Sequence, residues 1–193
     1  MGMTDPEVRQ IKDSRVLAAM SHPLRRRLLD VLKAYGPQPV GALAERTGQA
    51  PANVSHHMRV LGESGLVEEA TDLARDRRER WWRMAAASFQ WNPGEFGNDP
   101  ATTAVVDAAQ SLNLDRHVAL ARAWFGAAEE DQRTWGEGAF SADRWLRLTP
   151  EELYTVSREV VAVFDRWSAR EVPDDGQERE PVFVFAHGIP ATP

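Results

Sequence analysis

A line of polar side chains lies on one side of the helix predicted over residues 51–64. The apolar residues of this segment, Val54, Met58 and Leu61, recur at helical spacing and are expected to face inward. Advancing about 100° per residue places the remaining side chains on the opposite side. That outward line consists of Gln49, Ala52, His56, Arg59 and Glu63, with Asn53 and Ser55 on its flanks. Amide, hydroxyl, imidazole and guanidinium groups of this kind can reach base edges and phosphates.

The outward line has two interpretations. Each residue taken singly is an ordinary solvated side chain on a helical protein. The ordered set, on a helix that begins at Pro51, favours contact with double-stranded DNA, because a helix N-terminus also favours a phosphate. His57 falls near the buried edge of the same helix and is expected to pack there.

The helix over 51–64 follows a shorter predicted helix over 40–46. Val40, Leu43 and Ala44 of the first helix face inward, and Thr47-Gly48 forms the turn between the two. Two short helices joined by a tight turn containing glycine are typical of a helix-turn-helix. Two further helices are predicted before it, over 14–20 and 23–34, with Pro23 suited to a first helical turn.

A charged hairpin is predicted directly after the helix-turn-helix. The segments 66–70 and 79–84 have strand character, and the polar stretch 71–78 separates them. This order of elements is that of a winged helix. We expect the arginines of the wing to contact the DNA backbone or minor groove. They are Arg75, Arg77, Arg78 and Arg80.

Charge is distributed unevenly along the chain, whose net formal charge is −6. Residues 14–83 carry a net charge of +4, whereas residues 84–193 carry −9. Such asymmetry indicates nucleic acid as a partner of the basic part, or else chance clustering of surface charge. The helical pattern described above favours nucleic acid.

Residues 14–84 resemble the DNA-binding domain of the ArsR-type family of bacterial winged-helix regulators. The resemblance lies in Leu17-Ala18-Ala19-Met20-Ser21-His22-Pro23-Leu24-Arg25, Leu43-Ala44-Glu45-Arg46-Thr47-Gly48, Val54-Ser55-His56-His57-Met58-Arg59-Val60-Leu61, Gly65-Leu66-Val67 and Arg80-Trp81-Trp82-Arg83. It implies a homodimeric transcriptional regulator, commonly a repressor, that binds an imperfect palindrome with one recognition helix per half-site. It also implies that Ser55, His56 and Arg59 lie on the DNA-facing helix and that His57 packs at its edge.

Regulators of this family are known for metal sensing, but the residues here do not predict a metal site. The chain has no cysteine, which excludes thiolate sensors. Asp115 and His117 form one Asp-x-His pair, yet the second ligand cluster that a histidine–carboxylate site needs is absent from the sequence. His117 is therefore interpreted as a helix-face or packing histidine, and His187 is similarly unaccompanied by further ligands. No cofactor is expected.

The second half of the chain carries weaker patterns. A breaker-rich linker is predicted over 91–100, followed by one long helix or two abutting helices over 101–131. Thr149 and Glu152 match a capping box that opens a further helix. Strands are predicted over 144–148 and 182–186, and these could pair.

Four tryptophans fall in this half, Trp124, Trp135, Trp145 and Trp167. They are interpreted as core residues, with a pocket for an apolar effector of unknown identity or a buried dimer interface as alternatives. We expect the helix over 101–131, together with residues 14–20, to form the dimer interface, because a palindrome needs two copies of the module.

These patterns predict a mainly α fold with a small β-hairpin wing and a short C-terminal strand pair. The expected domains are a winged helix-turn-helix over 1–90, a linker over 91–100 and a helical dimerisation or sensing region over 101–193. Motifs typical of nucleotide-binding, hydrolase and metalloprotease enzymes are absent from the sequence, and so is any apolar run that could span a membrane. The prediction is a cytoplasmic, non-enzymatic DNA-binding regulator. The alternatives are a protein-interaction module that uses the winged helix without DNA, and a small-molecule-responsive regulator with an aromatic-lined C-terminal pocket.

Overall fold

The computed structural model describes residues 8–74, 76, 79–97 and 99–192. In this part of the chain, the α-helices are α1 (Ser14–Ser21), α2 (Pro23–Tyr35), α3 (Val40–Thr47), α4 (Pro51–Glu63), α5 (Pro100–Phe125), α6 (Glu129–Trp135) and α7 (Pro150–Ser168). The strands are β1 (Val8–Gln10), β2 (Gln38–Pro39), β3 (Val67–Glu69), β4 (Trp81–Met84) and β5 (Ser88–Gln90), and a 3-10 helix, η1, spans Pro93–Glu95. The chain divides into two units, Met1–Asp115 and Arg116–Pro193, and α5 runs through the boundary.

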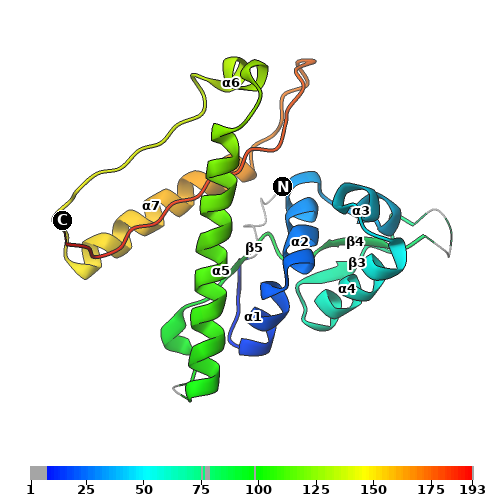
Figure 1. Cartoon of the computed structure of the whole chain (residues 1–193), viewed down its shortest axis with the longest axis horizontal. Helices are drawn as coiled ribbons and strands as arrows, with labels where there is room; N and C mark the ends of the chain where they lie inside the picture. The colour runs from blue at the N-terminus through cyan, green and yellow to red at the C-terminus, as the bar shows by residue number, and fades with distance from the viewer. Residues whose placement is uncertain (1–7, 75, 77–78, 98, 193) are drawn as a thin grey trace, which may run out of the picture. The chain divides into compact units, whose positions relative to one another are not determined.

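The first four helices begin where the sequence predicts them (Figure 1). The carboxylate of Asp13 accepts a hydrogen bond from the Arg15 amide at 2.9 Å and caps α1. His22 caps α2 in the same way, because its Nδ1 accepts from the Leu24 amide at 3.2 Å. Pro23 and Pro51 occupy the first turns of α2 and α4, where a missing N–H costs nothing.

Two glycines with positive φ end the helices of the helix-turn-helix. Gly48 has a φ of 66° after α3, and its amide donates to the carbonyls of Ala44 and Glu45. Gly65 has a φ of 68° after α4. A side chain would strain the backbone at either position, so both turns depend on glycine.

The wing is an antiparallel sheet in the order β2-β4-β3. Val67 pairs with Met84 and Glu69 with Trp82, while Gln38 pairs with Trp82 from the other side. The hairpin of β3 and β4 confirms the predicted wing. Its strands are shorter than the segments 66–70 and 79–84, and the tip residues Arg75, Arg77 and Arg78 lie outside the described residues.

A second small sheet was not predicted from the sequence. Strand β1 pairs in parallel with β5, with Val8 opposite Ser88 and Gln10 opposite Gln90. The Ile11 amide extends this pairing with a 2.8 Å hydrogen bond to the Gln90 carbonyl. The sheet ties the beginning of the described chain to the segment after the wing.

The core of the N-terminal unit lies between the helices and β4. It is built from aliphatic side chains together with Trp82, and its most deeply buried members are Leu17, Leu28, Leu29, Leu32, Leu43, Val54, Met58, Leu61 and Leu66. Phe96, Val106 and Ala109 belong to the same cluster. Part of the segment 91–100 and the first half of α5 therefore pack on this core.

The C-terminal unit is built differently, because none of its described side chains is buried. The helical segment predicted over 101–131 as one long helix or two abutting helices is observed as two helices, α5 and α6, with a break between Phe125 and Glu129. The capping box of α7 is present. The Glu152 amide donates to Thr149 Oγ1 at 3.2 Å, and the Thr149 amide donates to Glu152 Oε2 at 2.7 Å.

The predicted strand pair over 144–148 and 182–186 is wrong. Neither segment forms a strand, although both are described in full. Phe183 and Phe185 instead stack on each other with ring centroids 5.8 Å apart, and both rings lie tilted against His117 of α5. An alternating or apolar pattern favours a strand, but a strand also needs a partner to pair with.

The interpretation of the four C-terminal tryptophans as core residues is also wrong for the single chain. Trp145 and Trp167 are 67% and 58% exposed, and Trp124 and Trp135 are partly exposed.

Candidate DNA-binding surface

Helix α4 is held from behind by residues that are completely buried. Val54, Met58 and Leu61 have no exposed surface, and they belong to the same cluster as Leu28 and Leu43 of α2 and α3. These three positions fix the rotation of α4 about its own axis. The rest of its circumference must then face outward, as the spacing predicted.

The residues of the outward line lie where the sequence predicts. Gln49, Ala52, Asn53, His56 and Arg59 are exposed, and Ser55 is half-buried at the flank. They are therefore brought together on one face at the N-terminal half of α4. The chemistry on this face consists of amide donors and acceptors, one imidazole and one guanidinium, which suits base edges and phosphates.

The N-terminus of α4 carries no side-chain cap. The N-cap residue is Ala50, which has no side-chain hydrogen bond to the first turn, and Pro51 follows it. Just before the helix, the Gln49 amide donates to the Ala44 carbonyl at 3.0 Å, which fixes the turn. First-turn amides without a protein cap are the groups that a phosphate oxygen uses at a helix N-terminus.

His57 packs at the edge of α4 as expected and is only 9% exposed. Its ring lies 4.6 Å from that of His22, between centroids, and 5.2 Å from that of His56. Burial lowers the pKa of His57, and the nearby His22, Arg25 and His56 lower it further. Burial is also the main cause that lowers the pKa of His22, followed by Arg25. The rings of His57 and His22 thus join α4 to the start of α2.

The base of the wing is held by ion pairs at the surface. Arg83 donates to Glu68 Oε1 at 2.7 Å and to Asp72 Oδ1 at 3.0 Å. The hydrogen bond to Glu68 is the main cause that raises the pKa of Arg83, and Asp72 adds to it. Arg80 lies 3.6 Å from Glu69 and keeps an exposed guanidinium. Of the four wing arginines predicted to contact DNA, the structure describes Arg80, beside the hairpin strands.

Two contacts of residues near the ends of the described chain were not predicted from the sequence. Arg9 Nη1 donates to the carbonyl of Gly65 at 2.9 Å. Gly65 follows the end of α4 and lies 56 positions after Arg9 in the sequence. In the C-terminal unit, His117 Nδ1 and His187 Nε2 lie 3.2 Å apart. The interpretation of His187 as unaccompanied is therefore wrong. No local pattern signals either contact, since both join residues far apart in sequence.

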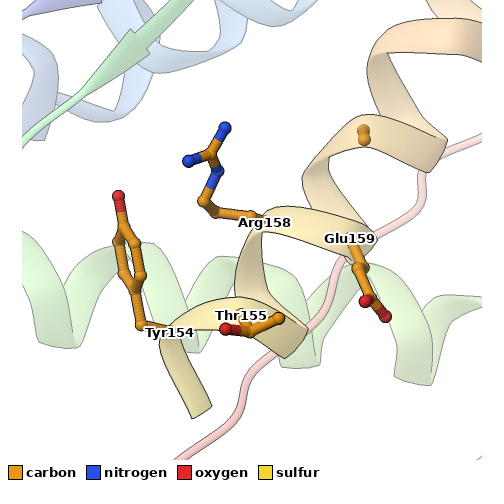
Figure 2. A pocket seen from close by; sticks show the side chains of 5 residues that line it. Tyr154, Thr155, Arg158 and Glu159 are labelled. Carbon is orange, nitrogen blue, oxygen red and sulfur yellow. The ribbon is translucent and has the colours of Figure 1, made fainter. Parts of the chain in front are cut away.

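Within the described residues, no group of three or more histidine, aspartate or glutamate side chains is arranged to hold a metal ion. Across the same residues, none of the helices has the length and apolar content of a membrane span. A shallow concavity of about 390 Å³ lies along one face of α7, lined by Tyr154, Thr155, Arg158, Glu159 and Ala162. Figure 2 shows Tyr154 and Arg158 side by side on this face. None of the four tryptophans lines it.

Comparison with known proteins agrees with this fold. Residues 20–70 match the family model described as a helix-turn-helix domain. No curated protein sequence matches the chain.

Solved structures with similar sequences cover a little over half of the chain. One is described as a possible transcriptional regulator for arsenical resistance, with 30% identity over 59% of this chain and 97% of that one, at a TM-score of 0.32. A second is a homodimeric winged helix-turn-helix DNA-binding domain from Mycobacterium bovis, a possible ArsR-family transcriptional regulator, with 27% identity over 56% and 78% and a TM-score of 0.34. The third is the transcriptional repressor BigR from Xylella fastidiosa, with 25% identity over 54% and 83% and a TM-score of 0.34.

Proposed function

We propose that this chain, whose N-terminal unit is a winged helix-turn-helix domain of the ArsR type, binds specific DNA sequences as a homodimer and represses transcription. Helix α4 would lie in the major groove of each half-site of an inverted repeat. The exposed guanidinium of Arg80, with the arginines of the wing tip, would contact the backbone or the minor groove.

The observation that carries the proposal is the exposed polar face of α4. A helix that packed against another protein would be expected to present apolar side chains outward, since these dominate the centre of such interfaces. Here the outward residues include Asn53, His56 and Arg59, and the apolar ones are buried behind them. The neighbouring first-turn amides and the basic charge of residues 14–83 add attraction for phosphates.

Homodimer formation is proposed through α1 and α5. Within the N-terminal unit, α5 buries Val106 and Ala109 against the core but leaves Leu112 and Leu114 49% and 46% exposed. Exposed leucines that the unit itself does not cover are suited to burial against a second copy of the same helix. Two copies would then present two α4 helices to a palindromic site.

Selection of bound duplexes from a random pool tests this function with the full-length chain. The proposal expects enrichment of an inverted repeat whose half-sites are about 10 base pairs apart, the spacing of one helical turn. Binding should also weaken steeply as salt is raised, because phosphate contacts release counterions. Absence of any enriched sequence, combined with undetectable binding to random duplexes at low salt, would refute the proposal.

A further inference from the structure

Two amide side chains meet at the point where α4 begins. Asn53 Nδ2 donates a hydrogen bond to Gln49 Oε1 at 3.0 Å, and both residues are exposed. Their backbones are fixed independently of this bond. Gln49 follows the left-handed Gly48 and donates its amide to Ala44, while Asn53 lies in the first turn of α4.

The hydrogen bond between the two amides leaves a defined set of groups on Asn53. An asparagine side chain has one carbonyl oxygen and two N–H groups. Because one N–H is bound to Gln49, Asn53 retains an acceptor, Oδ1, beside one remaining donor. Asn53 thus keeps one acceptor and one donor for a further partner.

The acceptor and the donor that Asn53 keeps match one base in the major groove. Adenine presents the N6 amino donor beside the N7 acceptor, which an asparagine amide can bind with two hydrogen bonds. Guanine presents two acceptors, cytosine a donor and thymine an acceptor beside a methyl group, so none of these offers both partners in that order.

We propose that Asn53 reads an adenine in each DNA half-site and that Gln49 is a positioning residue that orients the Asn53 amide. The inference rests on the proposed DNA-binding function and adds a base preference to it. The position of Asn53 in the first turn of α4 supports it, since residues at the N-terminal end of a recognition helix are those that contact base edges. The hydrogen bond to Gln49 Oε1 turns the nitrogen of the Asn53 amide toward Gln49, so Oδ1 is left for another partner.

Parallel selections with the full-length wild type, Asn53→Ala and Gln49→Ala test the proposal. The wild type is expected to enrich an A·T pair at one position of each half-site. It should prefer that pair over the other three by roughly 5- to 150-fold, which corresponds to the discrimination of about 1–3 kcal/mol by one bidentate contact. Asn53→Ala should lose the preference at that position and keep the rest of the sequence. Gln49→Ala should reduce the same preference by several-fold.

Two conservative variants test whether the hydrogen-bonding groups of Gln49 and Asn53 matter, and not only the presence of a side chain at each position. Gln49→Glu can only accept, so it should keep the Asn53 amide oriented and retain the adenine ratio, while its charge weakens binding to all duplexes. Asn53→Asp offers acceptors only, so the preference should move toward cytosine, whose N4 amino group donates. Gln132→Ala, which removes an amide from α6, is the control and should leave the ratio unchanged.

The outcomes are distinguishable from failure of the proposed function. If the wild type enriches a motif that Asn53→Ala also enriches with the same A·T pair, the adenine reading is overturned although DNA binding stands. If Asn53→Ala loses the adenine preference but Gln49→Ala keeps it, the positioning role of Gln49 is overturned. If the wild type enriches no motif, the proposed function fails first. Melting temperatures of the variants equal to that of the wild type show that folding is not the cause.

Discussion

The two units of this chain place their apolar side chains in opposite environments. In the N-terminal unit, leucines from three helices lose all contact with solvent, and Trp82 closes the core from the wing. In the C-terminal unit, Phe125, Phe140 and Trp145 are 77%, 78% and 67% exposed. The buried core of the first unit fixes the orientation of α4, whereas the second unit buries none of its described side chains.

The largest effect should come from a leucine of the first core. Leu61→Ala on α4 is expected to lower the free energy of unfolding by about 2–5 kcal/mol, because Leu61 is fully buried and its removal leaves a cavity. Leu146→Ala is the matched change in the C-terminal unit, where the side chain is 62% exposed, and should cost less than about 0.5 kcal/mol. Urea denaturation followed by circular dichroism measures both. Equal losses would show that the C-terminal unit has a core that a second copy completes.

The next effect concerns DNA and separates the face of α4 from its core. His56→Ala and Arg59→Ala should each reduce discrimination between the selected operator and a random duplex by about 1–3 kcal/mol if they read bases, with unchanged stability. Fluorescence anisotropy at fixed salt measures the two affinities. A residue whose loss weakens both duplexes equally contacts phosphate and does not read sequence.

A smaller effect tests how much the capping box contributes to the stability of α7. Thr149→Ala removes the capping box that opens α7, which should cost about 0.5–2 kcal/mol of helix stability. Thr149→Ser retains the hydroxyl and serves as the control. Because α7 buries none of its side chains, amide exchange should quicken throughout α7 and stay unchanged in α4. Protection lost equally in both helices would show that the two units fold as one.

The smallest effect is on pH dependence, and it belongs to the first unit. The pKa values of His22 and His57 are lowered in the folded chain, so the unfolded chain binds protons more readily than the folded one. Their contribution to stability is therefore present above the unfolded pKa of about 6.5 and is lost as pH falls through the lower folded values. We expect the melting temperature to fall between pH 7 and pH 5.

A variant of the helix cap identifies the source of this pH dependence. His22→Asn keeps an acceptor for the Leu24 amide but cannot titrate, so it should reduce the fall in melting temperature. His187→Asn, at an exposed position of the C-terminal unit, is the control. If His22→Asn leaves the fall unchanged, the paired rings of His22 and His57 are not its cause.

The same contrast explains how far the sequence predicts the structure. The face of α4 follows from Val54, Met58 and Leu61, and the capping box of α7 from Thr149 and Glu152, because each is set by residues a few positions apart. These predictions are confirmed as geometry, while contact of the α4 face with DNA stays a prediction.

Contacts between distant segments could not be predicted in this way. The pairing of β1 with β5 joins three-residue strands about 80 positions apart, and nothing in either strand selects the other. The pairing of His117 with His187, at 3.2 Å, has the same character. The apolar run of residues 182–186 predicts a strand, but a strand also needs a partner, and here the rings of Phe183 and Phe185 lie tilted against His117.

The central claim is that the outward face of α4 is the surface that meets the double helix. A ¹⁵N NMR titration of the full-length protein with its selected duplex tests this directly, because each backbone amide reports its own surroundings. The largest shifts are expected at exposed residues between Gln49 and Arg59, with smaller ones at the base of the wing near Arg80. Shifts confined to α6 and α7, with the α4 amides unchanged at saturation, would contradict the account.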